Sequence, residues 1–208
     1  MDVLDLYRWS GVVGILAGVL NVIVELLPER VGQPLDLLVN TLGLWVLAAL
    51  YLRQREASGF LGLIAYAIQS FGMALVIGFL FTQAFVLAGL DAAQRAAVLA
   101  GPTGLVTVIA LAIVTLGAVL FGIVTLQVGV FPKWAALLLM IGFVMAPIGA
   151  VAPHLIKSIG EFILSAGLIG LSYALFTNTG LQNQPKLYLI EQFKMKVEMA
   201  VSDYQERP

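Results

Sequence analysis

The stretch "TGLVTVIALAIVTLGAVLFGIVTLQVGV", residues 103–130, contains no Asp, Glu, Lys, Arg or His. A helix needs about 20 consecutive apolar residues to cross the hydrocarbon core of a bilayer, and this stretch is long enough. It lacks the regular alternation of apolar and polar residues that a membrane β-barrel strand shows. Because backbone N–H and C=O groups find no water in lipid, a membrane-spanning helix is the structure expected here.

The rest of the chain repeats this pattern. Of its 208 residues, 61% are hydrophobic and 11% are charged, whereas a soluble domain carries about 25% charged residues. Apolar runs predict six membrane helices, at residues 7–27, 34–52, 58–87, 103–130, 132–151 and 153–176. We therefore predict an all-α, polytopic membrane helical bundle with six transmembrane helices over residues 1–178, followed by a cytoplasmic amphipathic tail over residues 179–208.

The basic residues predict the orientation of this bundle. With six crossings, both termini share a side with the second and fourth loops. That side carries most of the basic residues: Arg8, Arg53, Arg55, Lys133, Lys186, Lys194, Lys196 and Arg207. The opposite side carries only Arg30, Arg95 and Lys157. Since cytoplasmic loops are enriched in Lys and Arg, both the N- and C-termini are expected in the cytoplasm.

Two segments lie outside the predicted membrane helices. In "GLDAAQRAAVLAGP", residues 89–102, Asp91 and Gln94 have the spacing of a capping box, and Gly101-Pro102 would end the helix. This segment is expected to form a short helix on the outer surface. The tail has an apolar helical face, although residues 193–199 alternate as a strand would. Its charges cancel, so packing against the bundle or a partner is expected rather than anchoring by a polybasic patch.

Nine polar residues in or beside the predicted membrane helices form the candidate ligand-binding set: Asn21, Glu25, Asp36, Asn40, Gln69, Gln83, His154, Lys157 and Glu161. Most of them fall in the outer half of the membrane. A charged side chain at the bilayer centre costs about 2.5–3.5 kcal/mol or more, so such residues usually face the bundle interior or a wet cavity. The set therefore predicts a polar cavity that opens outward, with the Asp91 helix as its roof.

Structural explanations for the same residues remain open. Lys157 and Glu161 have the i,i+4 spacing of a pair whose charges would cancel. Glu25 and Asp36 flank a short outer loop that holds Arg30, which is typical of an ion pair at the membrane interface. Hydrogen bonds between helices would equally explain the amides Asn21, Asn40 and Gln69, and a place among the lipid headgroups would explain His154.

Several kinds of chemistry have no motif in this sequence. It holds no nucleophile elbow, HExxH zinc motif, Walker loop or dinucleotide fingerprint. With no cysteine and one histidine, a structural metal site is not expected. The net charge of −1 gives no indication of nucleic acid as a partner. We accordingly predict no catalytic residue and no metal ligand, and the sequence does not identify whether a cofactor binds or which one.

One hairpin carries a resemblance. The segment "LFGIVTLQVGVFPKWAALLLMIGF", residues 120–143, combines a glycine, a short turn with a proline, a lysine and a tryptophan. It resembles a hairpin that recurs in small, uncharacterised bacterial multi-span membrane proteins. The resemblance covers two of the six expected membrane helices and implies a multi-pass protein of the bacterial inner membrane. It implies no activity and no site residue.

Three functions fit these observations. The first is a non-catalytic integral membrane protein whose interior binds a partner subunit, a second copy, a lipid or a hydrophobic small ligand. The second is a transporter or substrate-binding membrane subunit with its site in the outer half of the bilayer, since the size and helix number are similar to those of the substrate-binding subunits of energy-coupling-factor vitamin transporters. The third is an intramembrane enzyme acting on a lipid, with Glu161, Glu25 or His154 as acid–base groups.

Overall fold

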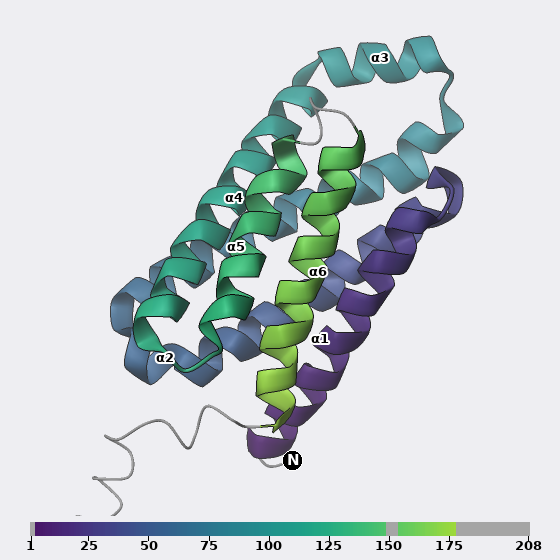
Figure 1. Cartoon of the computed structure of the whole chain (residues 1–208). Coiled ribbons are helices and arrows are strands. Elements are labelled where there is room, and N and C mark those ends of the chain that lie inside the picture. The colour runs from purple at the N-terminus through teal and green to yellow at the C-terminus, as the bar shows by residue number, and fades with distance from the viewer. Residues whose placement is uncertain (1–2, 149–153, 178–208) are drawn as a thin grey trace, which may run out of the picture.

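The computed structural model describes residues 3–148 and 154–177, and these residues form helices without strands. Figure 1 shows the long helices packed along one another, with α3 across one end. The elements are α1 (Val3–Leu26), α2 (Glu29–Phe81), a π-helical turn η1 (Thr82–Val86), a 3-10 turn η2 (Leu87–Gly89), α3 (Ala92–Ala100), α4 (Pro102–Val128), α5 (Lys133–Ile148) and α6 (His154–Thr177). The all-α prediction is confirmed for this part of the chain, and the predicted tail lies outside it.

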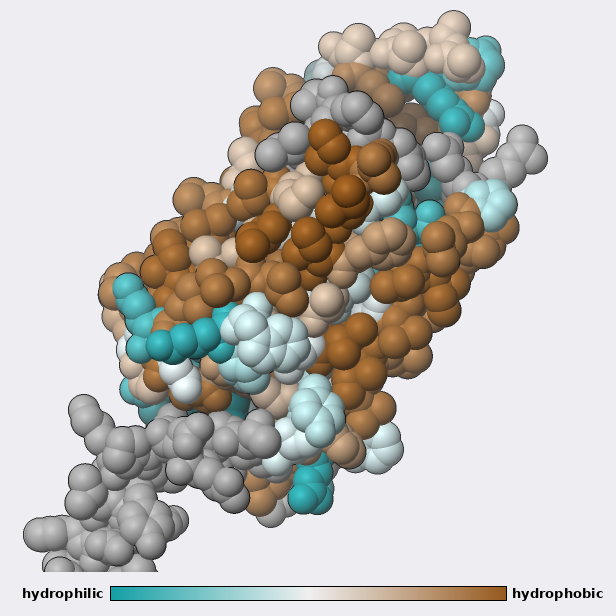
Figure 2. Space-filling model, in the orientation of Figure 1, coloured by the Kyte–Doolittle hydropathy of each residue, from teal (hydrophilic) through white to brown (hydrophobic). Residues whose placement is uncertain are grey.

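Four helical segments are long and apolar enough to cross a membrane: Leu4–Leu26, Val31–Gly89, Pro102–Val128 and Leu155–Thr177. Helix α5 is apolar but shorter. Figure 2 shows the flank of the bundle largely hydrophobic, with hydrophilic residues gathered mainly toward its ends. Large apolar side chains stand exposed on these helices, among them Trp45, Phe60, Phe71, Leu105, Val108 and Leu155. This is the surface expected of helices that contact lipid.

Gly59 divides α2 into two halves. Its φ of 56° and ψ of −144° lie in a region that glycine enters without steric cost. Beyond it the chain turns back, as the lower left of Figure 1 shows. Tyr51 stacks on Tyr66 with ring centroids 4.5 Å apart, and a Cβ on Gly43 would lie 3.3 Å from Cε of Met73. These pairs are symmetric about the reversal, so the two halves run antiparallel.

The predicted boundaries of this hairpin need correction. A separate turn between residues 52 and 58 was expected, but these residues are helical and the reversal is at Gly59. One positive φ reverses the chain, and the helical hydrogen bonds on either side of it are kept. Helix α2 also begins earlier than predicted, at Glu29, so that Pro34 lies inside it.

Glycines set how closely the helices approach. A Cβ on Gly18 of α1 would lie 2.5 Å from Cγ1 of Ile169 on α6. One on Gly117 of α4 would lie 2.5 Å from the backbone nitrogen of Gln69 on the second half of α2. At Gly117 a side chain would displace the neighbouring backbone, and at Gly18 it would displace the Ile169 side chain. Small residues of this kind let membrane helices pack through van der Waals contact where apolar burial drives little association.

Helix α3 confirms the predicted capping box. Asp91 Oδ1 accepts a hydrogen bond from the backbone nitrogen of Gln94 at 2.8 Å, and Gln94 Oε1 accepts one from the backbone nitrogen of Asp91 at 3.1 Å. Gly101 ends the helix and Pro102 begins α4, as expected. The two exchanged bonds satisfy backbone donors that a helix start otherwise leaves open. Helix α3 packs against the start of α4.

Candidate functional site

A cavity of about 380 Å³ lies between α1, both halves of α2, α4, α5 and α6. Sites for small molecules are usually about 300–1,000 Å³ and mostly apolar, with a few polar groups that orient the ligand. Seven of the nine predicted ligand-binding residues line this cavity: Asn21, Asp36, Asn40, Gln69, Gln83, Lys157 and Glu161. The structure therefore brings together residues from four separate stretches of the chain around one space.

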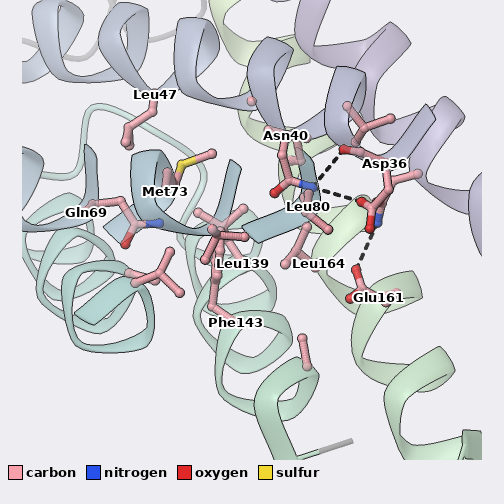
Figure 3. A pocket seen from close by; sticks show the side chains of 18 of the residues that line it. Asp36, Asn40, Leu47, Gln69, Met73, Leu80, Leu139, Phe143, Glu161 and Leu164 are labelled. Atoms are coloured by element: carbon pink, nitrogen blue, oxygen red, sulfur yellow. Dashed lines mark hydrogen bonds between the residues drawn. The ribbon is translucent and has the colours of Figure 1, made fainter. Parts of the chain in front are cut away.

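Asp36 and Asn40 form one wall of the polar end of the cavity. They lie one turn apart on the first half of α2. The Asn40 amide donates to the backbone oxygen of Asp36 at 3.0 Å and to its carboxylate oxygen Oδ1 at 2.8 Å. Figure 3 shows this pair beside Glu161 of α6. The amide thus holds the Asp36 carboxylate in place at the cavity wall.

Glu161 is held from the side of α1. Asn21 Nδ2 donates to Glu161 Oε2 at 3.1 Å and to Ser165 Oγ at 3.0 Å. Ser165 Oγ in turn donates to the backbone oxygen of Glu161 at 2.8 Å. Asn21 and Ser165 are buried, with 7% and 1% of their surface exposed. Because the same amide bridges two helices and a carboxylate, α1 and α6 cannot separate without leaving buried polar groups unpaired.

Lys157 pairs across to α1. Its Nζ lies 3.3 Å from Glu25 Oε2, and Ser158 Oγ donates to Glu25 Oε1 at 2.6 Å. The predicted i,i+4 pair between Lys157 and Glu161 is therefore wrong, because each residue meets a different side chain of α1. The Lys157 side chain is 45% exposed and that of Glu25 is 7% exposed. Glu25 stands next to the cavity, and it is not among the residues of its wall.

The described wall of the cavity carries more acidic than basic groups. Asp36 and Glu161 contribute two carboxylates, and Lys157 contributes one ammonium that already pairs with Glu25. The hydrogen bonds that the two wall carboxylates accept come from the neutral amides of Asn40 and Asn21. A carboxylate withdrawn from water is stabilised by a positive partner. This end of the cavity therefore has the chemistry to receive a cationic group that donates hydrogen bonds.

The cavity runs lengthwise through the bundle and becomes apolar with depth. On the first half of α2 its lining extends from Asp36 to Leu50, which is about 21 Å at 1.5 Å per residue. The deeper wall is made of apolar side chains: Leu47, Leu50, Met73, Val76, Phe121, Leu139 and Leu168. Gln69 is the exception there. Figure 3 shows its amide among these side chains, well away from Asp36 and Glu161.

Sequence reasoning missed the apolar part of the site. In a membrane helix an apolar residue gives the same signal whether it faces lipid, a neighbouring helix or a cavity. Gly43, which lines the cavity and leaves room in it, was missed for the same reason. The expected roof is wrong as well: within the described ranges no residue of α3 lines the cavity, because α3 packs on α4 instead.

Two predicted participants stay untested. The side chains of His154 and Arg30 lie outside what the structure describes, so the place of His154 and an ion pair between Arg30 and Glu25 remain predictions. Within residues 3–148 and 154–177, no group of three or more His, Cys, Asp or Glu side chains is placed to hold a metal ion.

The chain matches no protein-family model, no curated protein and no solved structure. The resemblance of residues 120–143 to hairpins of small bacterial membrane proteins accordingly stays a prediction.

Proposed function

We propose that this chain is a polytopic, non-catalytic membrane protein that binds an amphiphile with an amine head and a long apolar tail. One observation carries the proposal: a single elongated cavity changes from carboxylates and amides at one end to apolar side chains at the other. The cavity and the ligand share the same polarity gradient, so the ligand has one preferred direction in the bundle.

The head would bind between Asp36 and Glu161. An ammonium donates up to three hydrogen bonds and carries a positive charge. It would give the two carboxylates a positive partner, since the Lys157 ammonium of this wall pairs with Glu25. Charge-assisted hydrogen bonds are roughly twice as strong as neutral ones. Asn40 and Asn21 support the contact because they fix the carboxylate oxygens before the ligand arrives. Such preorganisation increases affinity by reducing what must be ordered on binding.

The membrane setting is the second element of the proposal. Each antiparallel half of α2 would cross the membrane once. Together with α1, α4, α5 and α6 this gives six crossings, with both termini in the cytoplasm. The 16 residues of α5 span about 24 Å.

Because the chain has no cysteine, single introduced thiols report topology cleanly. We expect Ala93→Cys in α3 to react with a membrane-impermeant maleimide on intact cells and Glu56→Cys to react only after permeabilisation; the reverse pattern would refute the orientation.

Native mass spectrometry of the gently solubilised protein tests the binding proposal. We expect the wild type to carry a co-purified amine-containing amphiphile, and both Glu161→Gln and Asp36→Asn to lose it. Glu56→Gln is the matched control, since Glu56 is exposed near the Gly59 reversal, away from the cavity. Retention of the same adduct by both cavity variants, or a bare mass for the wild type, would contradict the proposal.

Transport is a second candidate, and one observation favours it. Gln83 at the cavity lies in the π-helical turn Thr82–Val86, and π-turns occur frequently at functional sites. Phe79 lines both the cavity and a surface groove between α2 and α4 that includes Gly78 and Val106. A ligand passing between this groove and the cavity would pass Phe79. If the ligand takes this route, Phe79→Trp will slow the exchange of bound ligand and leave its equilibrium affinity nearly unchanged. An unchanged exchange rate would count against this route.

A further inference from the structure

Gln69 is an unusual residue for the deep end of the cavity. It lines the cavity, only 2% of its surface is exposed, and its side-chain oxygen Oε1 has no hydrogen-bond partner in the described part of the chain. More than nine in ten buried polar groups of proteins are paired. An amide held in an apolar wall with no hydrogen bond from the described part of the chain calls for a specific explanation.

The neighbouring helix holds Gln69 where it is. A Cβ on Gly117 of α4 would lie 2.5 Å from both the backbone nitrogen and the Cα of Gln69, and 2.8 Å from its Oε1. The backbone of α4 at Gly117 therefore packs directly against Gln69 and covers its Oε1. Figure 3 shows the amide nitrogen Nε2 on the other side, toward Met73 and Leu139, so Nε2 is the atom of the amide that borders the cavity.

Gln54 shows what a purely structural amide looks like in the same bundle. It too is fully buried, and its Oε1 also lacks a partner in the described ranges. Its Nε2, however, donates to Thr125 Oγ1 at 3.1 Å and so joins α2 to α4. Gln54 is not part of the cavity wall. Within residues 3–148 and 154–177 Gln69 makes no such bond between helices, and the open space beside it is the cavity.

We infer that the bound amphiphile carries a second hydrogen-bonding group, which Gln69 contacts about 10–16 Å from the amine. This inference rests on the proposed function. The distance follows from the hairpin: the pairs Gly43–Met73 and Tyr51–Tyr66 place Gln69 opposite Leu47. Leu47 follows Asn40 by seven residues and Asp36 by eleven, which is about 10 and 16 Å at 1.5 Å per residue.

This spacing defines a class of ligand. An extended chain advances roughly 1.2 Å per bond, so about 8 to 13 bonds separate the amine from a hydroxyl or carbonyl. Either group suits Gln69, because the amide nitrogen can donate a hydrogen bond to the oxygen of a hydroxyl or of a carbonyl. Simple alkylamines would leave the amide unpaired, and a site built around a hydrogen-bonding group rejects analogues that lack it.

Two commercial probes test the inference on the full chain in lipid nanodiscs. 10-Amino-1-decanol carries a hydroxyl at the required distance, and decylamine lacks it. For each variant the ratio of the decylamine Kd to the aminodecanol Kd is measured by calorimetry, with protein-free nanodiscs subtracted. We expect Gln69→Leu to lower this ratio about tenfold, because the hydroxyl loses its partner. Gln54→Leu is the matched control and is expected to leave the ratio unchanged.

The outcomes separate the two levels of the argument. If decylamine binds the wild type and Gln69→Leu leaves the ratio unchanged, the second contact is refuted and the amine site stands. An equal fall in Gln54→Leu would also refute the contact. If neither amine binds the wild type, the proposed function fails and the inference fails with it. Gln69→Met repeats the measurement with an unbranched side chain, in case leucine disturbs the packing against Gly117.

Discussion

Filling the cavity from Gly43 is expected to weaken ligand binding by up to about a hundredfold while the bundle stays folded. Gly43 lies in the cavity wall on the first half of α2. A Cβ there would meet one atom, Cε at the flexible end of Met73, at 3.3 Å. Gly43→Leu therefore extends its side chain into the empty space. The substitution removes room for the ligand without forcing two helices apart.

The size of both effects follows from this geometry. Replacing glycine by leucine inside a helix stabilises it by about 0.7 kcal/mol, and a small displacement of Met73 costs about 1 kcal/mol or less. The net change in the free energy of unfolding is thus within about 1 kcal/mol of zero. The four side-chain carbons displace about as many methylenes of the tail, each worth about 0.8 kcal/mol for a ligand arriving from water. The loss is up to about 3 kcal/mol, or two orders of magnitude in Kd.

The assay pairs calorimetric binding of decylamine with thermal unfolding of the same preparations. Gly78→Leu is the matched control: it lies on the other half of α2, is exposed, and has nothing within 4 Å of its Cβ position. We expect this control to gain the same helix propensity and to keep full binding. Unchanged binding in Gly43→Leu would refute the claim that the ligand occupies this cavity, because the leucine side chain fills part of the space that the ligand needs.

Three further substitutions test the framework around the cavity. Gly59→Ala should lower the free energy of unfolding by about 1–3 kcal/mol, because φ 56° with ψ −144° is a conformation that essentially only glycine adopts, while the added methyl group meets open space; an unchanged free energy in chemical denaturation would contradict this. Gly117→Ala should cost about 1–3 kcal/mol by overpacking α4 against Gln69, and an unchanged melting temperature would contradict the close approach. Asn21→Leu should destabilise the bundle by about 1–2 kcal/mol, since it removes both bonds to Glu161 and Ser165; if it unfolds like the wild type, the bridge does not hold α1 to α6.

Much of the fold was readable from the residues. Long runs without charge predict helices because a helix satisfies its own backbone in lipid, whatever its neighbours are. The cap of α3 was equally local, since Asp91 and Gln94 meet within one turn. The idea of a shared polar interior was also accessible, because ionisable side chains in membrane helices avoid lipid. Each of these conclusions depends on interactions within one helix or with the solvent.

Which side chains meet was decided by the packing of the helices. Lys157 and Glu161 have the spacing of an ion pair, yet α1 lies close enough through Gly18 for Lys157 to reach Glu25 and for Glu161 to reach Asn21. Phe71 and Met73 stand two positions apart in one apolar run; Phe71 is 59% exposed and Met73 is 6% exposed and lines the cavity. Apolar side chains are nearly equivalent in lipid, so their order along the chain carries no record of which face another helix covers. That choice, and with it the cavity, depends on where glycines let distant helices approach.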